Sequence, residues 1–215
     1  MHAGIIGGTG HEGRAVAARL ASAGVPLLVG SRQIERAQET VAALGTSLPL
    51  EAATNEQIAS DCDVVFLAVP FSGVAELLEA FRTRFMPGAL LIDLTVPLTF
   101  DRGVPAIADV AEGSATEFIR ARLPAEVRLA GAFKTIPASA LAKIDTPLDC
   151  DEFVCGDTPE VSAAAIDLLR RIPSLRLLDA GGLQSARLIE RMTALAIILN
   201  KRYKVRGVRF KIIGI

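Results

Sequence analysis

Apolar residues occur along this chain in short continuous runs, separated by longer stretches in which they recur at helical spacing. The continuous runs predict strands at residues 3–7, 26–30, 63–69, 89–94, 127–132, 151–155 and 174–178. The helical spacing predicts helices at residues 11–23, 32–44, 73–84, 112–122, 159–171 and 183–200. Strands that alternate with helices favour an α/β fold with a doubly wound, mostly parallel sheet of the Rossmann type, covered by helices on both faces.

A glycine-rich turn follows the first predicted strand and opens the first predicted helix. Gly8, Gly10 and Gly13 form the pattern GxGxxG. Its glycines allow a tight turn, a close approach of the backbone to a pyrophosphate and close packing of the helix on the strand. The helix start adds free N–H groups and the positive end of the helix dipole. The sequence therefore predicts a dinucleotide site at this turn.

The second predicted strand ends without the carboxylate that binds the ribose 2′-hydroxyl in NAD sites. Ser31 and Arg32 stand there instead, and Arg36 follows one helical turn later. A hydroxyl and guanidinium groups suit a 2′-phosphate, so we expect NADP as the cofactor. The alternative is an ordinary helix start, with Ser31 as the N-cap and both arginines solvated.

Three further strand ends carry a proline at or just past the strand. Pro70 ends the strand at 63–69 and is followed by Phe71, at the sheet edge where ligands of α/β proteins lie. Residues 95–99 and 134–138 are predicted loops over the same edge. They either shape a pocket or are plain connections.

The C-terminal part begins after the break at Gly181–Gly182. The predicted helix at 183–200 is apolar on more than one face, which favours burial against the sheet and against a second subunit. We therefore expect a Rossmann domain at 1–180, a small helical appendage at 181–215 that completes the substrate pocket or a subunit interface, and a homodimer. The tail from Lys201 to Lys211 carries six basic residues, as a solvated edge or as a cationic wall for an acidic ligand.

Composition narrows the function classes. The net charge of −1 gives no sign of a nucleic-acid partner. No apolar run is long enough to span a bilayer and the chain starts directly with a strand, so we expect a cytoplasmic protein without a membrane partner. The three cysteines lack metal-ligand spacing and are expected as buried thiols, and two isolated histidines cannot build a His-rich metal centre. We expect no metal.

Eight short segments, taken in order, resemble the NADPH:coenzyme F420 oxidoreductases, which are reductases of an 8-hydroxy-5-deazaflavin. The segments are Gly7–Gly10 with Gly13, Val29–Arg32, Val69–Pro70, Thr135–Ala138, Val154–Asp157, Leu178–Gly181, Ala186–Glu190 and Asn200–Lys204. The first is common to Rossmann proteins, whereas the last four are much more particular. The resemblance extends over nearly the whole chain.

The resemblance implies a direct hydride transfer between NADP(H) and coenzyme F420, with no acid or base catalyst. By position, it assigns Thr9, Gly10, His11 and Glu12 to the pyrophosphate, and Ser31, Arg32 and Arg36 to the 2′-phosphate. It places Phe71, Val96 and Ala138 beside the nicotinamide, and Pro97, Lys134, Thr135 and Ile136 around the deazaflavin ring. More weakly, it points Lys201, Arg202 and Lys204 toward the acidic tail of the deazaflavin.

The chain departs from the family at three positions. Lys134 stands where His is common, Gly182 where proline is usual and Phe71 where some members have tryptophan. A lysine beside the ring would either stabilise negative charge on the oxidised deazaflavin or mark a different substrate. The alternatives are therefore an NADPH-dependent reductase of a flavin, pterin or imine, and a protein that binds NADP without turnover.

Overall fold

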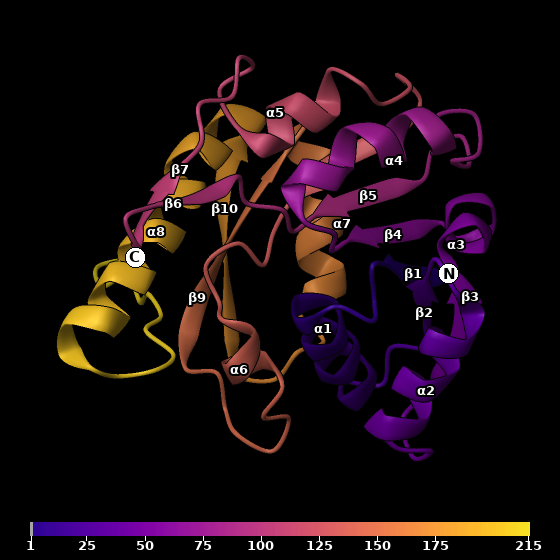
Figure 1. The fold of residues 1–215 in the computed structure, drawn as a ribbon, viewed down its shortest axis with the longest axis horizontal. Coiled ribbons are helices and arrows are strands. Elements are labelled where there is room, and N and C mark those ends of the chain that lie inside the picture. Colours follow the sequence, from indigo (N-terminus) through magenta and orange to yellow (C-terminus); the bar gives the residue numbers. More distant parts are fainter. Residues whose placement is uncertain (1) are drawn as a thin grey trace.

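A single twisted sheet runs through the centre of the molecule (Figure 1). The computed structural model describes residues 2–215. Within these residues the sheet has eight strands, which in spatial order are β10 (Leu175–Gly182), β9 (Cys150–Gly156), β8 (Arg128–Gly131), β5 (Leu90–Asp93), β4 (Val64–Leu67), β1 (Ala3–Ile6), β2 (Leu27–Ser31) and β3 (Leu50–Thr54). The six strands from β8 to β3 are parallel, in the order of a Rossmann sheet. β9 pairs with β8 in the antiparallel direction, and β10 runs parallel to β9.

Helices cover both faces of the sheet, as the near-continuous apolar strands require. The α-helices are α1 (His11–Ser22), α2 (Ile34–Leu44), α3 (Asn55–Asp61), α4 (Val74–Phe81), α5 (Ala115–Arg120), α6 (Ala138–Leu141), α7 (Pro159–Leu169) and α8 (Ala186–Tyr203). α1, α6 and α7 pack on one core, and α3, α4 and α5 pack on the other. β4 serves both cores, because Val64 and Phe66 face the first while Val65 and Leu67 face the second.

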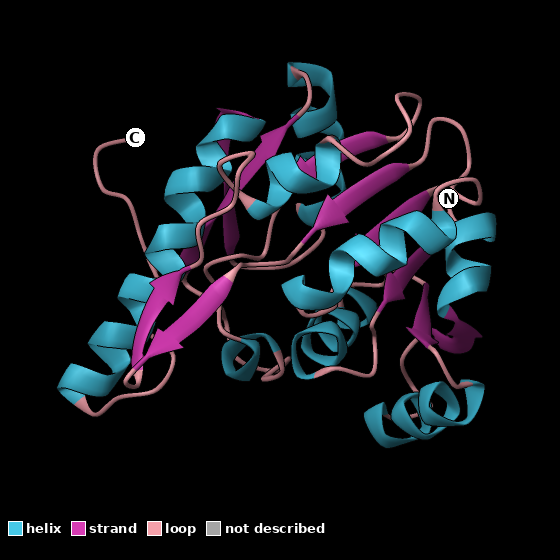
Figure 2. Cartoon of the chain, turned by 45° about the horizontal axis from the view of Figure 1, so that its top comes forward, coloured by secondary structure: helices cyan, strands magenta, loops and turns pink. Residues whose placement is uncertain are grey.

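The predicted elements are present, with shifted ends, and the sheet is mostly parallel as expected. Several elements were not predicted: β3, α3 and α6, and the single turn η1 (Phe71–Gly73). The helix predicted at 183–200 begins with a separate turn, η2 (Leu183–Ser185). The expectation of a loop throughout 95–99 is wrong, because Leu98 and Thr99 begin the hairpin of β6 (Leu98–Asp101) and β7 (Val104–Ile107). This hairpin lies along α8, outside the main sheet (Figure 2).

The structure also tests two expectations that rest on composition, the state of the cysteines and the lack of a long apolar segment. Cys62, Cys150 and Cys155 are free and buried, as predicted, and burial raises the pKa of each thiol to about 11. Residues 2–215 contain no helix that is both long and apolar enough to cross a membrane.

Candidate functional site

The glycine turn between β1 and α1 is compact and leaves backbone N–H groups free. Gly7 has a φ of +79°, which glycine adopts without strain. A Cβ atom at Gly13 would lie 2.5 Å from the Gly7 carbonyl oxygen, so a side chain there would push the helix off the strand. No side chain caps the start of α1 at Gly10. The first N–H groups of α1 therefore remain available to an anion.

A cavity of about 970 Å³ lies beside this turn, over the carboxyl end of β2. Ser31, Arg32 and Arg36 line it together with Thr9. Arg32 and Arg36 are exposed, and within the described residues neither forms an ion pair with the protein. The Ser31 hydroxyl accepts a hydrogen bond from the Gln33 N–H at 3.3 Å. This end of the site offers cations and donors to a phosphate.

Asn55 supports the turn from below. It is the first residue of α3, it is buried, and its Oδ1 accepts the Gly7 N–H at 3.1 Å. The sequence analysis missed both α3 and this residue. One signal was present: Thr54 and Gln57 form a capping box, in which each side chain bonds the other's backbone N–H.

A second cavity, of about 420 Å³, continues from the first and shares Gly10 and Pro70 with it. Its remaining wall comes from α1, from the segments after β4, β5 and β8, and from the C-terminal part. The lining side chains are His11, Glu12, Phe71, Leu94, Thr95, Val96, Phe133, Lys134, Thr135, Ile136, Pro137, Thr193, Ala196, Ile197, Asn200 and Val208. The two cavities form one cleft at the carboxyl ends of β1 and β4, where the strand order reverses.

Lys134 is at this wall, but its ammonium group points into the protein. The side chain is 0% exposed, and Nζ donates to Asp93 Oδ2 at 2.7 Å and to the Thr95 carbonyl oxygen. Glu190 Oε1 lies 3.3 Å from the same nitrogen. Burial alone would lower the pKa of Lys134, but Asp93 and Glu190 outweigh it and raise the pKa. The ammonium group is therefore charged and fully engaged.

Asp93 and Glu190 have further partners, so the network is dense. Asp93 Oδ1 accepts the backbone N–H and the hydroxyl of Thr95, and Asp93 Oδ2 accepts the Thr116 hydroxyl at 2.8 Å. Glu190 accepts the Ala115 N–H at 3.1 Å. The network joins β5, α5 and α8 at the wall of the smaller cavity.

Two other carboxyl groups at this wall lack such partners. Glu152 of β9 is fully buried; its Oε1 accepts the Phe133 N–H at 2.6 Å, and its Oε2 has no hydrogen bond. Glu12 Oε1 is also buried without a hydrogen bond. Burial raises the pKa of Glu12 to about 7 against the opposing Ala138 N–H. Burial raises the pKa of Glu152 to about 8; the Phe133 N–H opposes this shift and the neighbouring Glu12 adds to it.

Phe71, another side chain of the cavity lining, forms an aromatic pair with Phe118 of α5. The Phe71 and Phe118 rings meet edge to face with centroids 5.1 Å apart, and the Arg122 guanidinium lies 3.4 Å from the Phe118 centroid. Phe71 is thereby fixed at the mouth of the smaller cavity by α5.

Comparisons with known proteins show which sequences this chain resembles. The family model described as "NADP oxidoreductase coenzyme F420-dependent" matches residues 2–97. The F420-dependent NADP reductase of Methanothermobacter thermautotrophicus is 36% identical, over 99% of this chain and 94% of its own length. The chain belongs to the family of F420-dependent NADP reductases. The enzyme of that name from Methanothermobacter marburgensis is 35% identical over 99% of this chain and 98% of its own.

Among solved structures, a candidate F420-dependent NADP reductase from Arthrobacter sp. FB24 superposes with a TM-score of 0.84. It is 24% identical and the match covers both chains completely. This likeness supports the Rossmann-type fold together with its C-terminal helix.

Within this member of the F420-dependent NADP reductase family, most of the sequence-predicted residues line the cleft. Gly8 and Gly13 do not line it, and instead pack within the glycine turn. Pro97 is buried behind the wall, and Ala138 lies at the start of α6 with its N–H directed to Glu12. Lys201, Arg202 and Lys204 are exposed and are not part of the cavity lining. α8 meets the cavity through Thr193, Ala196, Ile197 and Asn200 instead.

The described residues contain no group of three or more His, Cys, Asp or Glu arranged to hold a metal ion. The residues around the smaller cavity that sequence reasoning missed are Asp93, Glu152 and Glu190. Each is a charged residue inside an apolar strand or helix pattern. That departure from the pattern was the available signal, because a buried charge needs a partner.

Proposed function

We propose that this protein transfers a hydride directly between NADP(H) and the deazaflavin coenzyme F420. The observation that carries the proposal is the likeness, over 99% of the chain, to enzymes named F420-dependent NADP reductases. The cleft supports it, since two cavities of different character meet end to end at Gly10 and Pro70. A nucleotide in the larger cavity would direct its nicotinamide into the smaller one.

The residues of the larger cavity fit NADP. In this proposal the uncapped start of α1 and Thr9 hold the pyrophosphate, while Ser31, Arg32 and Arg36 hold the 2′-phosphate. Two exposed guanidinium groups without protein partners suit a phosphate better than a neutral ribose hydroxyl. Glu76, on α4, also lines this cavity.

The smaller cavity would hold the two reacting rings. Bound NADP(H) and deazaflavin supply the hydride chemistry, so the protein has to orient flat rings and exclude water. Phe71, Val96 and Ile136 provide apolar surface for this, and α8 closes the far side. We propose that residues 181–215 act as a unit that completes this pocket.

The internal position of Lys134 bears on the acceptor. Its ammonium group is held by Asp93 and Glu190, so it presents no unpaired positive charge to a ring in the cavity. The exchange of the usual histidine for lysine therefore alters the support of the wall more than the surface that the acceptor meets. This favours the deazaflavin over a different acceptor.

The decisive experiment follows the absorbance of oxidised coenzyme F420 after NADPH is added. We expect fast bleaching with NADPH and little with NADH, because only NADPH carries the 2′-phosphate. Binding of NADPH is measured separately by fluorescence. Binding without bleaching would assign the protein to another acceptor, such as a flavin, pterin or imine, and an equal rate with NADH would contradict the 2′-phosphate site.

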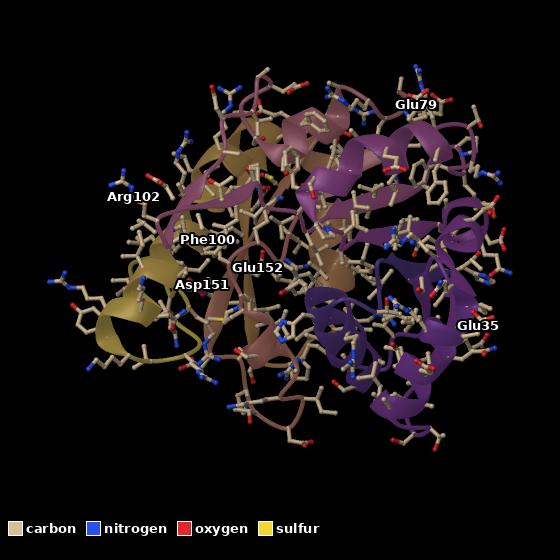
Figure 3. The ribbon with its side chains drawn as sticks, viewed as in Figure 1. Glu35, Glu79, Phe100, Arg102, Asp151 and Glu152 are labelled. Carbon is tan, nitrogen blue, oxygen red and sulfur yellow. The ribbon has the colours of Figure 1, made fainter. Side chains whose placement is uncertain are left out.

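We also propose a homodimer that uses the surface of α8 and the hairpin. Large apolar side chains that are exposed in the single chain gather on β6–β7, α8 and the tail: Phe100, Val104, Leu188, Leu195, Ile198, Tyr203, Val205, Ile213 and Ile215. Figure 3 places Phe100 on the hairpin over α8. Apolar area of this extent is typical of subunit contacts. Sedimentation of the wild type and of Leu188→Glu would test it, with a monomeric wild type contradicting the proposal.

A further inference from the structure

Three buried side-chain oxygen atoms among residues 2–215 have no hydrogen-bond partner, and all three belong to one wall. They are Glu12 Oε1, Thr135 Oγ1 and Glu152 Oε2. Glu12 and Thr135 line the smaller cavity, and Glu152 bonds the backbone of the segment that carries Thr135. Unpaired buried polar atoms are costly, so their gathering at a ligand cavity points to a role there.

The two carboxyl groups interact with each other. Glu12 enters from the first turn of α1 and Glu152 from β9, and the charge of Glu12 disfavours ionisation of Glu152. The other titratable or charged groups packed around this wall are His11 on α1, Lys134 after β8, Asp93 on β5, Cys150 and Cys155 on β9, and Glu190 on α8. Lys134 is the cation among them, and it is already paired with Asp93 and Glu190. No cation on the described chain neutralises Glu12 directly.

Glu12 stands where the charge of a bound dinucleotide would change. If the 2′-phosphate lies at Arg32 and the pyrophosphate at the start of α1, the nicotinamide enters the cavity that Glu12 lines. This placement rests on the proposed function. The ring is neutral in NADPH and carries a positive charge in NADP⁺.

We propose that Glu12, backed by Glu152, changes its protonation with the redox state of the bound nicotinamide: it is a carboxylic acid beside NADPH and a carboxylate beside NADP⁺. An adjacent positive ring favours the ionised form, whereas a neutral ring leaves the acid in its desolvated, protonated form. Glu152 keeps its proton through neutral pH, since Glu12 ionises first. A proton released at Glu12 as NADPH is oxidised can go toward the single proton that an acceptor takes up together with the hydride, and solvent supplies the remainder at pH values where Glu12 is partly ionised.

Calorimetric titration of the whole protein with NADP⁺ and with NADPH, each in two buffers of different ionisation enthalpy, tests the proposal. The pyrophosphate and the 2′-phosphate are common to both ligands, so the difference in proton count isolates the effect of the ring. At pH 7 we expect NADP⁺ to release about half a proton per site more than NADPH. The NADP⁺ affinity relative to that of NADPH should rise with pH, about tenfold for each unit by which the ring lowers the pKa of Glu12.

Three variants test whether the released proton comes from Glu12 or from another carboxyl group. Glu12→Gln should abolish the difference in proton count and make the affinity ratio independent of pH. Glu152→Gln should retain both, because the amide resembles the protonated acid. Glu79→Gln, on the exposed face of α4 and far from Glu152 in Figure 3, is the matched control and should behave as the wild type.

Two results would overturn the proposal. One is an equal proton count for NADP⁺ and NADPH in the wild type, and the other is a difference that persists in Glu12→Gln. A protein that binds neither nucleotide would contradict the proposed function as well, so the two failures are distinguishable. Should Glu12→Gln fold poorly, an equal proton count for NADP⁺ and NADPH in the wild type would still overturn the proposal.

Discussion

The larger cavity, which we call the nucleotide end of the cleft after its proposed ligand, presents exposed cations and bare backbone. The smaller cavity, which we call the ring end after the rings proposed to bind there, is walled by carboxyl and ammonium groups that are buried. Arg32 and Arg36 at the first end have no ionic partner in the described chain and remain free for a ligand. Lys134 at the second end is committed to Asp93 and Glu190. Substitutions at the first end should therefore alter binding with little effect on folding, while those at the second should alter stability before they alter chemistry.

Removal of the buried ammonium group should have the largest effect. Lys134→Met leaves Asp93 and Glu190 buried near each other without a cation, and loss of one partner of a buried pair costs about 3–5 kcal/mol. Urea unfolding should report a loss of this size. Lys143→Met, at an exposed position, is the control and should change stability little. A loss below about 1 kcal/mol in Lys134→Met would contradict the importance of the network.

Glu152 should make the stability of the ring end depend on pH. Its pKa is raised from 4.5 to about 8 in the folded protein, so the folded state binds more protons than the unfolded state between these values. The stabilising contribution is complete below pH 4.5 and is lost as pH rises through 8. Between pH 5 and pH 8 the wild type should lose about 3 kcal/mol relative to Glu152→Gln. Parallel unfolding curves of the two proteins across this range would show that the carboxyl group is not desolvated.

Arg32 tests the other end of the cleft. Arg32→Ala removes the proposed charge-assisted bond to the 2′-phosphate, and such a bond is worth about 1.5–3 kcal/mol, or roughly 10- to 150-fold. The KM for NADPH should rise by this factor while the KM for NADH and the unfolding curve stay nearly constant. Arg171→Ala, also exposed, is the matched control. An unchanged preference for NADPH would show that Arg32 does not bind the phosphate.

The contrast between the two ends also explains what the sequence could predict. The glycine turn and Ser31–Arg32 are local, because a strand, a turn and a helix start place them within a few residues. Lys134 meets Asp93 from 41 residues away, and only the packing of β5 against β8 brings them together. From the sequence, Lys134 was therefore expected beside the ring with its ammonium group available. β3 was missed for a related reason: it is a short edge strand that includes the exposed Glu51, so no continuous apolar run marks it.

Replacement of Asn55 should have the smallest effect of these substitutions. It also separates the role of the glycine turn from that of the arginines. Its Oδ1 accepts the Gly7 N–H at 3.1 Å, so Asn55→Ala removes one neutral hydrogen bond beneath the glycine turn and leaves Arg32 untouched. The loss should be about 0.5–1.5 kcal/mol, or roughly 2- to 10-fold. In the proposed function the turn holds the pyrophosphate of both nucleotides, so the KM values for NADPH and NADH should rise by the same factor. Arg32→Ala is the natural comparison, since it should affect NADPH selectively. If Asn55→Ala also discriminated between the two nucleotides, the division of labour between the turn and the arginines would be wrong, and Asn55 would have to position the 2′-phosphate through β2.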